Sequence, residues 1–273
     1  MFLTRLFSFV SATALLSSAA LAHEFWIEPP KFQVQKESPF VAELKNGQKF
    51  EGVSQPYFEN RTTRLDVSLG KDTTEIIGRM GDRPAIQLPA PAKDGLMIIT
   101  HEAAPSIVTY REWEKFVNFI QHKDFQQAQA THENRGWAKE NFRESYTRHS
   151  KSLIAVGHGE GDDRAMGLET EFIALDNPYR DGFDGVFDVS LQYLGTPRRD
   201  AQIEIYAKDA AGLVSVSIQR TDAKGIAAIP VKTGHSYLLD AVVLRKAANA
   251  TTAEAGPIWE TLWASMTFAV PDK

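Results

Sequence analysis

The feature that most constrains this chain is a regular alternation of short apolar segments and turn sequences in its C-terminal third. Six segments have strand character: 186–194, 201–207, 213–219, 227–231, 237–244 and 262–270. Separators such as Gly195-Thr196-Pro197 and Asp222-Ala223-Lys224-Gly225 hold the residues that tight chain reversals need. This spacing is typical of a small antiparallel sandwich. We therefore predict a β-sandwich domain over residues 179–273.

The preceding residues, 23–178, are predicted to form a second β-rich domain. Short apolar segments broken by turn residues run from Phe32 to about Tyr110 and again over residues 152–156. Between them lies an amphipathic helical pattern, with apolar residues at i, i+3, i+4 and i+7: Trp113, Phe116, Val117 and Ile120. The polar stretch that follows predicts a helical insert over about residues 111–150. The fold class expected is mainly β, with two β-sandwich-like domains.

Residues 1–22 have the three-part layout of a cleavable secretory signal. Arg5 gives a positive start, an apolar run extends from Leu6 to about Leu16, and Ala20-Leu21-Ala22 provides the small residues that a signal peptidase recognises. The apolar run is too short and too rich in Ser and Ala for a membrane span. We expect a periplasmic protein that begins at His23 and has no stable membrane insertion after cleavage.

Composition and motifs limit the metal ligands, partners and reaction types that we expect for this chain. The chain has no cysteine, so a metal site has to use histidine, carboxylate, backbone or water ligands. Its net charge of -5, with both signs interspersed, argues against a nucleic-acid partner. The sequence contains no phosphate-binding glycine loop, dinucleotide fingerprint or nucleophile elbow, and no paired carboxylates stand out. We expect a protein that is not an enzyme.

Cleavage after Ala22 would place a free α-amino group on His23. The amine and imidazole nitrogens of one residue then chelate the same ion, and a second histidine brought near by the fold completes a three-nitrogen site. Such a site suits copper(II), nickel(II) or cobalt(II). The other histidines show no i, i+4 pair, so a site has to be assembled from distant segments. The alternative, that His23 is simply tolerated after the cleavage point, stays open.

Six segments carry a family resemblance when they are taken together. They are 23–29 (HEFWIEP), 144–151 (ESYTRHSK), 177–179 (NPY), 221–225 (TDAKG), 234–241 (GHSYLLDA) and 259–268 (WETLWASMTF). As a set they resemble periplasmic components of ABC-type cobalt or nickel uptake systems, a family largely catalogued as a domain of unknown function. The resemblance implies a C-terminal domain similar to transthyretin-like or carboxypeptidase-regulatory sandwiches.

The same resemblance implies a function and a ligand set. The protein would capture a nickel or cobalt ion, with copper also possible, and present it to a membrane metal importer. The implied metal ligands are His23, at the family's His-x-Phe-Trp start, together with His132 and His235. Two other functions stay open: a copper histidine-brace redox enzyme, and a metal-free structural or adhesion module in which His23 is replaceable.

Overall fold

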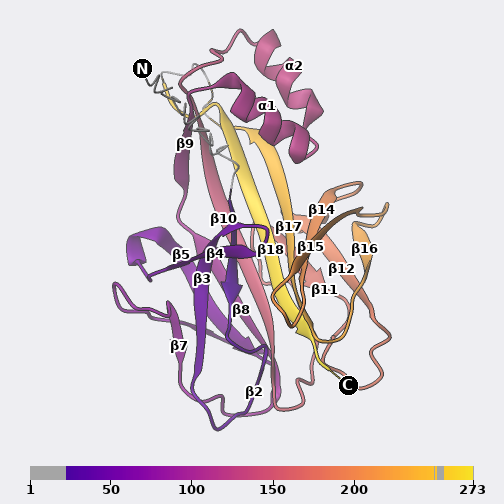
Figure 1. Ribbon diagram of the computed structural model, residues 1–273. Coiled ribbons are helices and arrows are strands. Elements are labelled where there is room, and N and C mark those ends of the chain that lie inside the picture. Colours follow the sequence, from indigo (N-terminus) through magenta and orange to yellow (C-terminus); the bar gives the residue numbers. More distant parts are fainter. Residues whose placement is uncertain (1–22, 249, 251–254, 273) are drawn as a thin grey trace, which may run out of the picture.

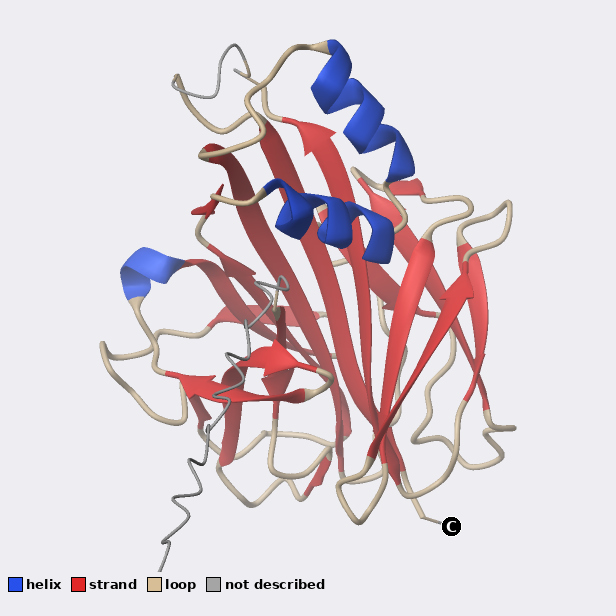
Figure 2. Ribbon diagram, turned by 45° about the horizontal axis from the view of Figure 1, so that its top comes forward, coloured by secondary structure: helices blue, strands red, loops and turns tan. Residues whose placement is uncertain are grey.

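The computed structural model describes residues 23–248, 250 and 255–272, so the predicted signal peptide, residues 1–22, lies outside the described residues. The described chain is mainly β, with a small helical insert, and its strands form three sheets in a sandwich-like arrangement (Figures 1 and 2). The predicted fold class is confirmed. No helix in this part of the chain is long and apolar enough to cross a membrane.

A ten-stranded sheet forms the middle layer. Its main path is β15 (Val214–Arg220), β14 (Gln202–Lys208), β17 (His235–Lys246), β18 (Trp259–Val270), β10 (Phe142–Val156), β8 (Gly95–Ala103), β5 (Thr62–Leu69) and β6 (Asp72–Glu75). The short strands β2 (Gln33–Val34) and β9 (Ser106–Tyr110) also pair with β10. Strands β10 and β18 lie parallel, from Glu144 opposite Trp259 to Ser152 opposite Thr267. One sheet thus continues across the predicted boundary between residues 178 and 179.

Two smaller sheets pack on the middle layer. The first consists of β1 (Glu24–Glu28), β3 (Phe40–Gln48), β4 (Glu51–Gln55) and β7 (Ile86–Leu88); the second consists of β11 (Thr170–Ala174), β12 (Val186–Tyr193), β13 (Thr196–Pro197) and β16 (Ile226–Pro230). Met97 and Ile99 of β8 lie in the core beneath the first small sheet, whereas Leu96 and Ile98 lie in the core beneath the second. Successive residues of a strand point to opposite faces, so the small sheets cover opposite faces of β8. Burial on both faces explains its continuous apolar run.

The helical insert covers one end of the middle sheet. Helices α1 (Trp113–His122) and α2 (Gln126–Asn134) follow β9, and a 3-10 turn, η1 (Glu59–Arg61), precedes β5. Phe116 of α1 packs with Trp259 and Trp263 of β18 in a third core. The two tryptophans are 4% and 3% exposed, so they belong to the core beneath the insert.

The insert is shorter than predicted. Its second helix ends at Asn134, and residues 142–150, which we expected to be helical, form the first part of β10. This strand is not recognisable in the sequence because polar side chains within it are buried and hydrogen-bonded to side chains of neighbouring strands. Glu144 accepts hydrogen bonds from Tyr110 and Thr261, and Ser265 donates to Ser150. A strand stabilised by such pairs lacks the alternation of apolar and polar residues that identifies strands in a sequence.

Candidate functional site

His23 lies exposed immediately before β1. Its carbonyl oxygen accepts a hydrogen bond of 3.1 Å from Nη2 of Arg148. The residue lines a groove of about 700 Å³, together with parts of β3 and β4 and the start of β15. Glu51 supplies a carboxylate to this groove, and its described lining includes no second histidine. The structure thus fixes the backbone of His23 and leaves its side chain accessible.

His132 lies in α2, where it is completely buried. Trp259 Nε1, which can only donate, lies 3.1 Å from its Nδ1, and the carbonyl oxygen of Ala138, which can only accept, lies 2.9 Å from its Nε2. These partners define a neutral ring whose Nδ1 accepts and whose Nε2 donates. Trp113 and Phe142 pack on the ring at centroid distances of 4.7 Å, and burial lowers the pKa of His132. In this arrangement neither nitrogen has a lone pair free for a metal ion.

His235 begins β17 at the opposite end of the sheet. Its Nδ1 donates to the carbonyl oxygen of Thr233 at 2.9 Å, which leaves Nε2 free of that bond. His235 pairs with Val270, the last residue of β18, whereas the partner of His132, Trp259, is the first residue of the same strand. A strand rises about 3.3 Å per residue, so these two ends lie about 36 Å apart. His132 and His235 therefore do not share one ion.

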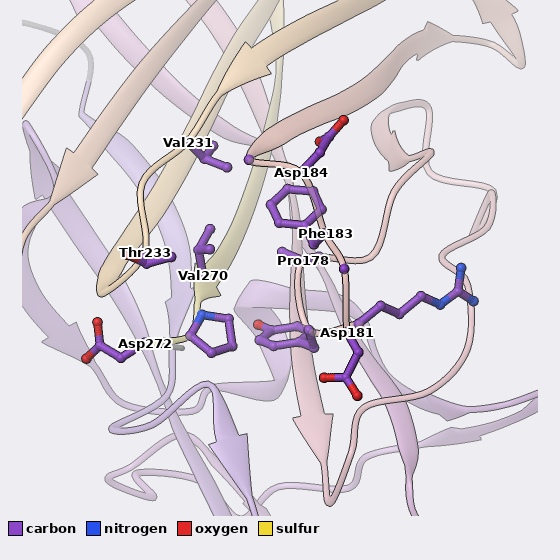
Figure 3. A pocket seen from close by; sticks show the side chains of 13 residues that line it. Pro178, Asp181, Phe183, Asp184, Val231, Thr233, Val270 and Asp272 are labelled. Atoms are coloured by element: carbon purple, nitrogen blue, oxygen red, sulfur yellow. The ribbon is translucent and has the colours of Figure 1, made fainter.

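A pocket of about 550 Å³ lies near His235, at the end of the sheet where the chain finishes (Figure 3). Thr233 and Val270 line it, with three carboxylates from Asp181, Asp184 and Asp272. Figure 3 shows these carboxylates pointing in different directions rather than toward one centre. Across residues 23–272, within the described ranges, no group of three or more His, Cys, Asp or Glu side chains is placed to hold a metal ion.

Acidic side chains do converge between the helical insert and β1, but a lysine lies among them. The Lys123 ammonium is 2.9 Å from Glu204 Oε1 and 2.9 Å from Asp240 Oδ2, and its side chain is 5% exposed. Burial, together with the nearby charge of Asp240, raises the pKa of Glu24 to about 7. Tyr206 donates a hydrogen bond of 3.2 Å to Glu24. Lys123, which directly follows α1, ties that helix to β1, β14 and β17, and His122 at the end of α1 also contacts Glu204 at 3.1 Å. The basic partners of this cluster are therefore side chains of the protein.

Arg148, which the sequence pattern does not single out, contacts His23 and also lines a second cavity together with Phe25 and His101. The Arg148 guanidinium lies 4.5 Å from the ring centroid of Tyr146 and 5.8 Å from that of Phe25. Tyr146 and Arg148 are two residues apart, so they share one face of a strand. That signal becomes visible only when residues 142–150 are interpreted as a strand rather than a helix.

Comparisons with known proteins place the chain in a family without a known activity. The model of the family described as "Domain of unknown function (DUF4198)" matches residues 20–245. No curated protein matched.

Two solved structures share low similarity with the chain. A tetra-tandem repeat in the extending region of a large adhesion protein is 9% identical, with a TM-score of 0.22, and the match covers 90% of this chain and 49% of that one. The D0-D1 domain of Intimin is 11% identical, with a TM-score of 0.22 and coverage of 89% and 97%. The chain thus spans about half the length of the first structure. By its family match, the chain belongs to the DUF4198 family of domains of unknown function.

Proposed function

We propose that this chain is a periplasmic, non-enzymatic accessory protein that binds a transition-metal ion and presents it to a membrane importer. The ion is nickel or cobalt, and copper also fits the ligands. After removal of residues 1–22, the α-amino nitrogen and the imidazole of His23 hold the ion as a chelate. Neither His132 nor His235 takes part.

The observation that carries this proposal is the placement of His23. Strand β1 pairs with β3 along its whole length, from Glu24 opposite Gly47 to Glu28 opposite Glu43. The hydrogen bond from Arg148 also holds the His23 carbonyl. A chelating residue at the start of a rigid strand loses less conformational freedom on binding than one on a loose tail. Its exposed side chain at the rim of a groove is accessible to an ion and to a docking partner.

The small number of protein ligands, two nitrogens on one ion, favours a carrier over an enzyme. A chelate of two nitrogens leaves positions in the metal coordination sphere open to water or to ligands of an importer. An ion held in this way is released by ligand exchange. A copper histidine-brace enzyme needs a third nitrogen, and among the described residues that line the groove His23 is the sole imidazole. These points support transfer of the ion rather than redox turnover.

Metal uptake by cells tests this function. Cells that lack the chain are complemented with the native chain, His23→Ala or His235→Ala, and accumulation of nickel and cobalt is measured at low external concentration. We expect the native chain and His235→Ala to restore accumulation, and His23→Ala to fail. Restoration by His23→Ala would favour the metal-free module, and unchanged accumulation in cells lacking the chain would contradict the carrier.

A further inference from the structure

A second cavity is lined by residues of the first small sheet and of the middle sheet, including parts of β9 and β10. It measures about 440 Å³, within the range of sites that hold one small molecule. Its lining comes from strands far apart in the sequence, including β1, β3, β5, β8 and β10. No function proposed above uses this cavity.

The charged side chains among the described residues that line the cavity are all positive. Arg61 and Arg148 both contribute, and no aspartate or glutamate is among the described residues that line the cavity. The Nε atom of Arg148 is buried and has no hydrogen-bond partner among the described residues. A buried donor of a charged group that lacks a partner costs free energy, so it marks a position where an acceptor is missing.

His101 supplies a second unpartnered group. It is 2% exposed and lines the cavity, and within the described part of the chain its buried Nδ1 has no hydrogen-bond partner. Its other ring nitrogen lies 3.4 Å from the hydroxyl of Thr62. When that hydroxyl donates, Nδ1 carries the ring proton and is a donor. Burial, with a contribution from His149, lowers the pKa of His101 to about 3, so the ring is neutral near pH 7.

Aromatic rings cover the faces of both guanidinium groups. Arg148 lies over Tyr146 and Phe25, and Arg61 lies over Phe58 at 5.2 Å from the ring centroid. With a face covered, a guanidinium group interacts through the N–H bonds at its edge, and this planar fork matches a carboxylate. The same three rings line the cavity and offer apolar surface to the body of a ligand.

We propose that this cavity is a binding site for a small aromatic carboxylate. The carboxylate lies between the edges of Arg148 and Arg61, where it supplies the acceptor that Arg148 Nε lacks, and His101 Nδ1 donates a further hydrogen bond. The aromatic body of the ligand packs on the rings of Phe25 and Phe58. The site is separate from the metal chelate at His23, although Arg148 contacts both.

Calorimetric titration of the metal-free chain with benzoate tests the proposal, with benzamide and inorganic phosphate as comparison ligands. Benzamide keeps the ring and lacks the charge, whereas phosphate keeps the charge and lacks the planar carboxylate and the ring. We expect benzoate to bind at one site, and benzamide and phosphate to bind at least about tenfold more weakly, the equivalent of one charge-assisted hydrogen bond.

Three variants locate the site. Arg148→Gln removes the buried donor, and Arg61→Gln removes an exposed one, so the second variant keeps the test valid if the first fails to fold. Each is expected to weaken benzoate binding about tenfold or more. Arg135→Gln is the matched control, because Arg135 lies 5.3 Å from the Trp137 ring centroid but does not line this cavity. Absence of benzoate binding, equal affinity for benzamide, tighter binding of phosphate, or unchanged affinity in Arg61→Gln would each overturn the proposal.

Discussion

The buried ammonium of Lys123 gives the sharpest stability prediction. Lys123 contacts Glu204 and Asp240 at 2.9 Å each. In Lys123→Met, Asp240 stays buried without that cation, and Glu204 keeps the imidazole of His122 at 3.1 Å as its basic partner. Breaking a buried ion pair by removing one partner costs about 3–5 kcal/mol. For a chain of this size that corresponds to a midpoint of thermal unfolding about 10 °C lower. Urea denaturation followed by tryptophan fluorescence, at pH 7, measures the free energy of unfolding.

The control for this variant is Lys139→Met. Lys139 lies 2.8 Å from Glu133, a similar separation, but the two side chains are 51% and 40% exposed. Water screens such a pair, so this variant is expected to change stability little. The deficit of Lys123→Met also has a pH dependence. Burial already raises the pKa of Asp240, and removal of the ammonium raises it further, so the deficit shrinks as pH falls and the carboxylates bind protons. A loss no larger than that of the control, or a deficit that grows at low pH, would refute this reasoning.

Two further predictions concern buried polar groups. Burial raises the pKa of Glu144 from 4.5 to about 7. A carboxyl group whose pKa is higher in the folded state contributes stability below pH 4.5, and this contribution is lost as the pH rises toward 7. Glu144→Gln should remove about 3 kcal/mol of that dependence, measured as the difference between urea unfolding at pH 4.5 and pH 7.5, and an unchanged difference would contradict it. His132→Phe should lower stability by about 1–3 kcal/mol, because Trp259 loses its buried acceptor, while nickel affinity of the chain beginning at His23 stays the same. Loss of calorimetric nickel binding in a fully stable His132→Phe would show that His132 is a ligand.

The fold class could be predicted because much of the chain uses conventional strand signals. Strands β12, β14, β16 and β17 lie within two residues of their predicted bounds, since apolar segments alternate with Gly- and Asp-containing turns. The strand β10 was predicted only from residue 152 onward. Its first half buries polar groups whose partners lie more than a hundred residues away, such as Ser150 with Ser265 and Glu144 with Thr261. Such pairing depends on the tertiary structure, so a local pattern does not contain it.

Parts of the candidate site also depend on tertiary contacts that a local sequence pattern does not contain. His23 could be singled out from the sequence, because its chemistry depends on its own position after a cleavage signal. The state of His132 could not, because the group that uses its Nδ1, Trp259, is 127 residues away. Arg61, which directly precedes β5, likewise lines one cavity with His101 and Arg148 only because β5, β8 and β10 are neighbours in the middle sheet. The division into domains 23–178 and 179–273 stays a prediction, although one sheet joins strands of both.

A chelate at His23 can be tested by calorimetric titration with nickel, cobalt, copper and zinc. The chain that begins at His23 is compared with a variant that has one alanine added before His23. The added residue removes the α-amino group from His23 and leaves the described fold intact. We expect tight binding of one nickel or cobalt ion by the first form and none by the extended form. Equal binding by both forms would contradict a chelate at His23, and no binding by either form would contradict metal binding altogether.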